Sequence, residues 1–230
     1  MNQKKDVREF YNKKYSGFEG LPGYSVEKNK IDSWLSLLSS EKLFNLSDLN
    51  SQTCIDLGCG FGLKTFALSL YFKFTLGVDF SSKAIEVASL LNSLPEKLNF
   101  TCSEVGSVSS KYNFISAIGF SDFNVKDVSL QCERITKICK QLLLPDGIIM
   151  ITSFTDFSGA SPTGWHLHTR KELKNLIALI KRNGFMARII FPSNSLHAFH
   201  KSDGQGKLDL LKQTIALKPK IYLMIIQSYG

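Results

Sequence analysis

The sequence of 230 residues predicts an α/β fold with a mostly parallel β-sheet. Short apolar runs alternate with helical patterns between residues 53 and 151, and each strand–helix–strand step implies a parallel pair with a right-handed crossover. The first run ends in a glycine-rich loop, and the second ends in Asp79. Because parallel α/β sheets hold ribose hydroxyls on an acid at the tip of a strand, a nucleoside site is predicted together with the fold.

Residues 1–50 precede the first predicted strand. Ser25 is predicted to cap a helix, because apolar residues such as Ile31, Trp34 and Leu35 follow it at roughly helical spacing. Five aromatic residues lie at or upstream of the start of this helix, among lysines and glycines: Phe10, Tyr11, Tyr15, Phe18 and Tyr24. One interpretation is that these rings pack on the core.

The glycine loop follows a predicted strand that ends at Leu57. Asp56 lies two residues before Gly58, and Gly60 and Gly62 follow at alternate positions. Glycine has no Cβ, so the backbone turns sharply there and a ligand can approach the main chain. A helix is predicted from Leu63 to Tyr71, and the next strand runs from Phe74 to Val78 before Asp79.

Further strands and helices are predicted in the second half of the chain. Strands are predicted at 98–102 and 112–120, then a Pro145–Gly147 turn leads into the strand 148–151, and an amphipathic helix spans Arg170 to Arg182. The last two strands, 186–191 and 220–226, have no convincing long helix between them, although 209–217 could form a short one. The last strand is therefore expected to be antiparallel.

The loop does not match the dinucleotide fingerprint Gly-x-Gly-x-x-Gly, because Leu63 stands at the third glycine position and Gly62 comes one residue early. With Asp56 and Asp79, this spacing instead resembles class I S-adenosylmethionine-dependent methyltransferases. The resemblance covers about residues 50–192 and the final strand. It implies a Rossmann-like three-layer sandwich with a seven-stranded, mostly parallel sheet whose last strand is antiparallel.

The resemblance also implies a domain organisation. Residues 1–50 would form an N-terminal arm and helix that act as a lid over the cofactor. Residues 51–230 would form the methyltransferase domain, with an insertion at 193–219 before the last strand.

The same resemblance implies cofactor contacts. Amides of the glycine loop would face the methionine carboxylate, and Asp56 would orient the loop or meet the ammonium group. Asp79 would accept two hydrogen bonds from the ribose. The adenine contact falls on Ser103 or Glu104, and Phe80 would pack along the ribose or adenine, or in the core. The expected cofactor-binding residues are Asp56, Gly58, Cys59, Gly60, Gly62, Asp79, Phe80, Glu104 and Phe120.

Methyl transfer requires alignment of the nucleophile, and a base only when the acceptor must lose a proton. Candidates stand at the carboxyl ends of the fourth and fifth strands: Asp122, His166 and His168. No Asn/Asp-Pro-Pro-Tyr motif follows the fourth strand, which disfavours methylation of exocyclic amines of that type. His166, His168, His197 and His200 lack a ligand set typical of a metal site, so no metal is predicted.

Composition limits the function classes. The chain carries 43% hydrophobic and 21% charged residues, and it contains no apolar run long enough to cross a bilayer and no apolar secretory core. The five cysteines lack metal-ligand spacing and are expected to be reduced, consistent with a cytoplasmic enzyme.

The net charge of +8 is concentrated at the ends, since residues 170–230 carry 11 Lys and Arg against 3 Asp and Glu. Such a field favours an anionic acceptor or nucleic acid, although a solvated basic face explains it equally well. We therefore expect methyl transfer from S-adenosylmethionine to an oxygen or nitrogen of a small molecule. The alternatives are an RNA or protein methyltransferase, a catalytically silent methyltransferase-like partner protein, and a nicotinamide oxidoreductase.

Overall fold

The structure is a computed structural model that describes residues 9, 24–92, 94, 96–155, 166–190 and 220–228. Its centre is a seven-stranded sheet with the strand order β3-β2-β1-β4-β5-β7-β6. β7 pairs antiparallel with both β5 and β6, and the other pairs are parallel. The strands are β1 (Thr53–Leu57), β2 (Phe74–Asp79), β3 (Leu98–Cys102), β4 (Tyr112–Ile118), β5 (Leu143–Thr155), β6 (Phe185–Ile190) and β7 (Lys220–Ser228).

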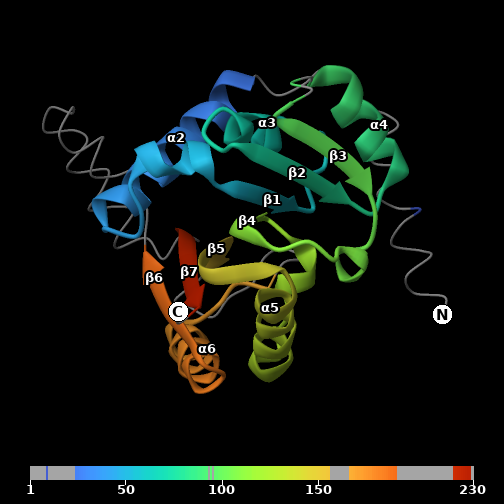
Figure 1. Ribbon diagram of the computed structural model, residues 1–230. Coiled ribbons are helices and arrows are strands. Elements are labelled where there is room, and N and C mark those ends of the chain that lie inside the picture. The colour runs from blue at the N-terminus through green and yellow to red at the C-terminus, as the bar shows by residue number, and fades with distance from the viewer. Residues whose placement is uncertain are drawn as a thin grey trace, which may run out of the picture.

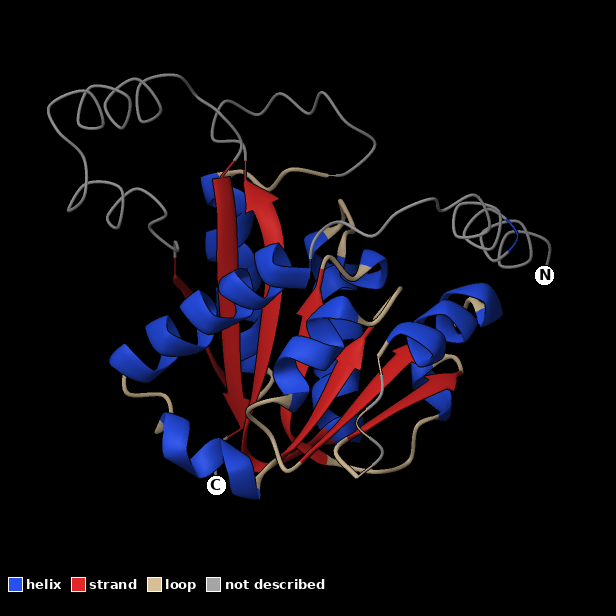
Figure 2. Cartoon of the chain, turned by 90° about the horizontal axis from the view of Figure 1, so that it is seen from above, coloured by secondary structure: helices blue, strands red, loops and turns tan. Residues whose placement is uncertain are grey.

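Helices cover both faces of this sheet, so the predicted three-layer arrangement is confirmed (Figures 1 and 2). One face carries α2 (Tyr24–Ser40), α3 (Leu63–Ser69) and α4 (Ser82–Leu91). The other carries α5 (Val128–Leu142) and α6 (Arg170–Arg182). Three short 3₁₀ helices complete the described elements: η1 (Leu46–Ser51), η2 (Val105–Ser107) and η3 (Ser121–Phe123).

Two apolar cores result, because successive strand residues point to opposite faces of the sheet. Within β1, Cys54 packs with Leu35 and Leu68 under α2 and α3. Its neighbour Ile55 packs with Ile135 and other apolar residues under α5 and α6. All five residues have fully buried side chains, and continuous apolar strands are what a sheet covered on both faces requires.

Two local expectations need correction. α2 begins at Tyr24, so Ser25 lies inside its first turn and does not precede the helix as a cap. β5 begins at Leu143 and includes the predicted Pro145–Gly147 turn. The turn survives as an irregularity within the strand, because the register with β4 shifts between Tyr112 and Phe114 and Asp146 has a φ of 59°.

The strand order places the switch of winding direction between β1 and β4. The chain builds outward from β1 through β2 to β3, then returns to the other side of β1 with β4. In open α/β sheets, ligands bind in the crevice outside the carboxyl ends of the strands at such a switch. The site is therefore sought where the glycine loop follows β1 and Phe120 follows β4. The aromatic residues of the expected lid at 10–18, and the insertion at 193–219, lie outside the described residues.

Candidate functional site

The glycine loop between β1 and α3 has a left-handed backbone at Gly58, Gly60 and Gly62, with φ values of 68°, 53° and 75°. Its amides point into the protein. Gly58 and Cys59 donate to the carbonyl of Val78 at 2.8 and 3.1 Å, and Gly62 donates to the carbonyl of Cys59 at 3.0 Å. The expectation that the amides of these residues face a methionine carboxylate is therefore wrong for this structure, because they stabilise the turn itself.

Phe100 of β3 explains why glycine is needed at Gly62 of the loop and at Gly77 of β2. A Cβ built on Gly62 would lie 2.5 Å from the Phe100 ring, and one built on Gly77 would lie 2.6 Å from it. The ring of Phe100 therefore occupies space that side chains would otherwise fill. The ring packs against both Gly62 of the loop and Gly77 of β2, and this close packing fixes the position of the turn.

Asp56 lies beneath the loop and is 2% exposed. Its carboxylate accepts hydrogen bonds of 2.7 Å from the hydroxyls of Thr65, in α3, and Ser116, in β4. Burial raises the pKa of Asp56, and these hydrogen bonds oppose the shift. The side chain thus ties β1, α3 and β4 together under the switch point, and this geometry favours the loop-orienting role over contact with an ammonium group.

Asp79 ends β2 at the same edge and is 6% exposed. One carboxylate oxygen accepts from the amide of Gly60 at 3.0 Å, and the other accepts from the amide of Ser81 at 2.8 Å. Burial raises the pKa of Asp79, while the backbone hydrogen bonds lower it. A carboxylate oxygen can accept more than one hydrogen bond, so acceptor capacity remains for a ligand.

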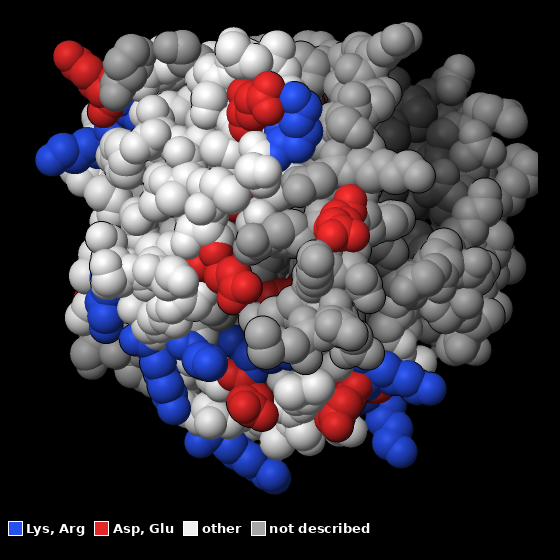
Figure 3. Space-filling view, turned by 90° about the vertical axis from the view of Figure 1, so that its right-hand side faces the viewer, with Lys and Arg blue, Asp and Glu red and all other residues white. Residues whose placement is uncertain are grey.

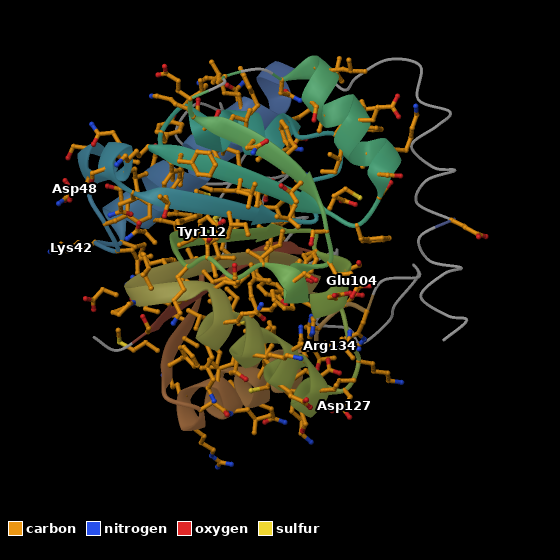
Figure 4. All side chains as sticks on the ribbon, turned by 45° about the vertical axis from the view of Figure 1, so that its right-hand side comes forward. Lys42, Asp48, Glu104, Tyr112, Asp127 and Arg134 are labelled. Atoms are coloured by element: carbon orange, nitrogen blue, oxygen red, sulfur yellow. The ribbon has the colours of Figure 1, made fainter. Side chains whose placement is uncertain are left out.

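Three further residues predicted to bind the cofactor follow the ends of β1, β2 and β3. Glu104 follows β3 and is exposed at the edge of the sheet, at the opposite end from Lys42 and Asp48 (Figure 4). Phe80 is half-buried at the end of β2. Cys59 is half-buried in the loop, and burial raises the pKa of its thiol well above the ordinary value, so the thiol stays protonated.

Phe120 connects the glycine loop to the end of β4. Its ring would lie 2.9 Å from a Cβ at Gly58, and it packs edge-on against Phe123 at a centroid distance of 5.0 Å. Asp122, a candidate base, is exposed in η3, and its backbone carbonyl accepts a 3.0 Å hydrogen bond from Arg134 on α5 (Figure 4). This contact thus fixes the backbone of η3.

His168 is fully buried, with 0% exposure. Its Nε2 lies 2.9 Å from Oε1 of Gln131, and its Nδ1 lies 3.0 Å from the hydroxyl of Tyr222. Gln131 in turn donates its amide to the carbonyl of Phe123 at 2.6 Å. Because both ring nitrogens are engaged in the core, His168 is not placed to take a proton from an acceptor, and the prediction that it is a base is not supported by its geometry.

His166 has a different environment. Its side chain is 18% exposed, and its Nε2 lies 3.1 Å from Oε1 of Glu172. The side-chain amide of Asn124 clamps the backbone of His166, donating to its carbonyl at 2.9 Å and accepting from its amide at 2.8 Å. Since Asn124 follows η3, the imidazole is held at the carboxyl edge beside the end of β4.

The sequence contains one pattern that could have identified Glu172, the partner of His166, in advance. Thr169 and Glu172 form a capping box at the start of α6, the Thr-x-x-Glu pattern of a helix N-terminus. Gln131, Asn124 and Tyr222 carried no comparable signal, because their roles depend on contacts between segments far apart in the chain.

The described part of the chain contains no group of three or more metal-ligating side chains, and none of its helices combines the length and apolarity needed to span a bilayer. A groove of about 710 Å³ lies between α5 and α6, and its lining includes Cys132, Lys137 and Asn183 but not the glycine loop.

Comparisons with known proteins agree with this geometry. Residues 55–151 match the family model described as a methyltransferase domain. No curated protein sequence matches the chain significantly. Among solved structures, magnesium protoporphyrin IX methyltransferase (ChlM) from Synechocystis PCC 6803, with bound S-adenosylhomocysteine (SAH), matches with a TM-score of 0.58 at 16% identity, covering 98% of this chain and 99% of that chain.

Two further structures extend the comparison. An S-adenosylmethionine-dependent methyltransferase from Clostridium acetobutylicum ATCC 824 matches with a TM-score of 0.59 at 12% identity, and both chains are covered completely, at 100%. The [4+2]-cyclase SpnF matches with a TM-score of 0.56 at 15% identity, covering 86% of this chain and 81% of that chain. Identities this low establish the fold, and one fold can support several reactions.

The matched segment contains the whole crevice at the switch point, from β1 through the glycine loop and Asp79 to β4 and β5. Residues 55–151 thus match a methyltransferase domain, and the chain has the fold of structures described as S-adenosylmethionine-dependent methyltransferases.

Proposed function

We propose that this protein transfers a methyl group from S-adenosylmethionine to an oxygen or nitrogen atom of a small-molecule acceptor. The observation that carries the proposal is the hydrogen bond from the Gly60 amide, in the loop after β1, to Asp79 at the end of β2, beside the switch point. This contact presents a carboxylate to the crevice where a ribose would lie. S-adenosylmethionine supplies an electrophilic methyl group on its sulfonium, so the protein has mainly to bind and align.

Local room at the end of β4 supports this proposal. Gly119 follows β4 with a φ of 67°, and no atom of the described residues would lie within 4 Å of a Cβ built there. Asp79 would hold the ribose hydroxyls, Phe80 and Glu104 would lie along the nucleoside, and the loop from Gly58 to Gly62 would line the methionine part. Asp56 would act beneath them by holding the loop in place.

A small acceptor is favoured by two of the matching structures. The chain covers about the full length of ChlM and, at 100% of this chain and 92% of that chain, a plantazolicin methyltransferase (BamL) solved with a triazolic analogue and SAH. Magnesium protoporphyrin IX and the triazolic analogue are both small molecules, which supports a small acceptor for this chain.

The basic surplus of residues 170–230 favours a second candidate, methylation of RNA or of a protein. Basic and acidic side chains are mixed on the lower half of the face seen in Figure 3, without a continuous basic stripe. RNA binding would weaken steeply as salt is added, whereas binding of a neutral small acceptor would not. A salt titration of RNA binding separates the two candidates.

The first test is calorimetric titration of the purified protein with SAH. Binding in the micromolar range supports the cofactor assignment, and a screen of small phenols, carboxylates and amines with isotopically labelled S-adenosylmethionine then identifies the acceptor class. A folded protein that gives neither heat nor thermal stabilisation with SAH contradicts the proposal and favours a catalytically silent partner protein. Fluorescence enhancement of reduced nicotinamide nucleotide would instead support an oxidoreductase.

A further inference from the structure

His166 is held from three sides by groups that come from different elements. Glu172 of α6 contacts Nε2, the ring of His168 packs edge-on at a centroid distance of 4.9 Å, and Asn124 clamps the backbone. The imidazole is nevertheless partly exposed, with 18% of its side chain accessible. A ring that is tightly oriented and still accessible is the arrangement that acid–base catalysis needs.

Glu172 decides which ring nitrogen carries the proton. Its Oε2 accepts from the amide and the hydroxyl of Thr169 at 2.7 and 2.8 Å, so the carboxylate is fixed at the start of α6. Burial raises the pKa of Glu172, but the hydrogen bonds from Thr169 and the nearby histidines outweigh it, and the net pKa is lowered. An ionised carboxylate can only accept, and therefore Nε2 of His166 must donate to it.

The lone pair of neutral His166 then resides on Nδ1. Within the described part of the chain, Nδ1 makes no hydrogen bond, whereas both nitrogens of His168 are engaged. We propose that Nδ1 of His166 accepts the proton of the methyl acceptor, and that Glu172 is the positioning residue that keeps this nitrogen deprotonated. The inference rests on the proposed function and adds the identity of the base and of its partner.

The proton and electron balance of the step is complete. The O–H or N–H bond of the acceptor breaks, and its proton passes to Nδ1 of His166. The freed electron pair forms the bond to the methyl carbon, while the carbon–sulfur bond breaks and its pair returns to sulfur. The positive charge of the sulfonium ends on the imidazolium, next to the carboxylate of Glu172, which stabilises it.

The variant Glu172→Gln tests this arrangement with little change of shape, because glutamine also satisfies a capping box. The amide of Thr169 can only donate, so the oxygen of Gln must face it. The NH₂ group must then face Nε2 of His166 and donate to it. The variant is therefore expected to move the proton of His166 from Nε2 to Nδ1 and to remove the basic lone pair from Nδ1.

The experiment is a two-bond proton–nitrogen correlation spectrum of ¹⁵N-histidine-labelled protein, recorded free and with saturating SAH. A His166→Asn sample assigns the signals. Wild type is expected to show the Nε2–H tautomer and Glu172→Gln the Nδ1–H tautomer. An Nδ1–H tautomer in wild type, or the same tautomer in both proteins, overturns the inference. This reading requires no acceptor.

Kinetics with the acceptor from the screen complete the test. Glu172→Gln is expected to lower kcat at least tenfold with little change in the KM of the acceptor, and an unchanged kcat overturns the inference. Thr169→Ala, which removes the cap but leaves the Glu172–His166 contact, is the matched control and should retain the wild-type tautomer. Calorimetry with SAH on the same samples separates the two proposals, because SAH binding with the wrong tautomer overturns this inference alone.

Discussion

The hydroxyl of Ser116 donates a 2.7 Å hydrogen bond to the carboxylate of Asp56 across the boundary between β4 and β1. The two residues are direct partners in the parallel ladder, and both are buried. A buried carboxylate needs such donors, because removal from water penalises its charge. The geometry of the crevice thus depends on a buried contact that lies beneath the glycine loop.

Ser116→Ala is expected to lower the free energy of unfolding by about 1–3 kcal/mol, the scale for a hydrogen bond to a charged group. Urea denaturation followed by circular dichroism measures it. Ser33→Ala removes an exposed hydroxyl from α2 and should change stability by less than about 0.5 kcal/mol. Equal stabilities of the two variants would show that the Asp56–Ser116 contact contributes little.

Asp79→Ala is expected to weaken SAH binding by about 1–3 kcal/mol, because the ribose hydroxyls lose a charged acceptor. Calorimetry measures the change. Asp48→Ala, in η1 at the opposite end of the sheet, is the control and should bind SAH like wild type. An unchanged affinity in a folded Asp79→Ala protein would remove the ribose assignment.

The affinity for SAH is expected to fall as the solution becomes acidic. Burial raises the pKa of Asp79, so the carboxylate becomes protonated at a higher pH than an ordinary aspartate would. The protonated form loses an acceptor, and affinity is therefore present above this raised pKa and lost as pH falls through it. Calorimetry between about pH 4 and 8 tests this, and Asp79→Asn should show a flatter profile. A wild-type profile as flat as that of Asp79→Asn would contradict the prediction.

Gly62→Ala and Gly77→Ala are both expected to destabilise the fold, because each new methyl group would collide with Phe100. Only Gly62 also has a positive φ, of 75°. Adding Phe100→Leu should therefore recover most of the stability lost in Gly77→Ala but leave about 1 kcal/mol of backbone strain in Gly62→Ala. Thermal melts of the single and double variants measure both effects, and equal recovery at the two positions would argue against the strain.

His168→Ala is expected to lower stability by about 2–4 kcal/mol, because it opens a cavity and removes one hydrogen-bond partner each from Gln131 and Tyr222. SAH affinity should change little. Tyr222→Phe, which removes a single hydroxyl, should cost about 1 kcal/mol. Chemical denaturation and calorimetry test both variants, and a stable His168→Ala protein that has lost methyl transfer would restore His168 as a candidate base.

Much of the fold could be predicted from the sequence, because the signals are local. Apolar runs marked the strands, and the helix predicted from Arg170 to Arg182 matches α6 at both ends. The glycine spacing and Asp79 predicted a nucleoside site at the ends of the first two strands, whereas the strand order followed from the family resemblance. Residues 145–147 were predicted to form a turn before the fifth strand, but β5 includes them, and only a shift of the register with β4 marks their place.

The rest of the site depends on contacts that sequence spacing does not reveal. The glycine amides were expected to face a ligand, but Val78, Cys59 and Asp79 accept their hydrogen bonds. His166 and His168 stand two residues apart and were equivalent candidates. Only the burial of one ring against Gln131 and Tyr222, and the exposure of the other beside Glu172, distinguishes them.

The antiparallel orientation of β7 determines where a segment of the chain can be exchanged without disturbing the sheet. β6 runs parallel to β5 and ends at Ile190, and β7 begins at Lys220 and pairs backwards along both. The chain therefore leaves and rejoins the sheet at the same edge as the glycine loop. The paired residues of β5, β6 and β7 all lie outside 191–219. Exchanging that segment for another is therefore expected to leave the sheet intact. For protein engineering, the sheet would serve as a scaffold on which a new segment between β6 and β7 changes the choice of methyl acceptor.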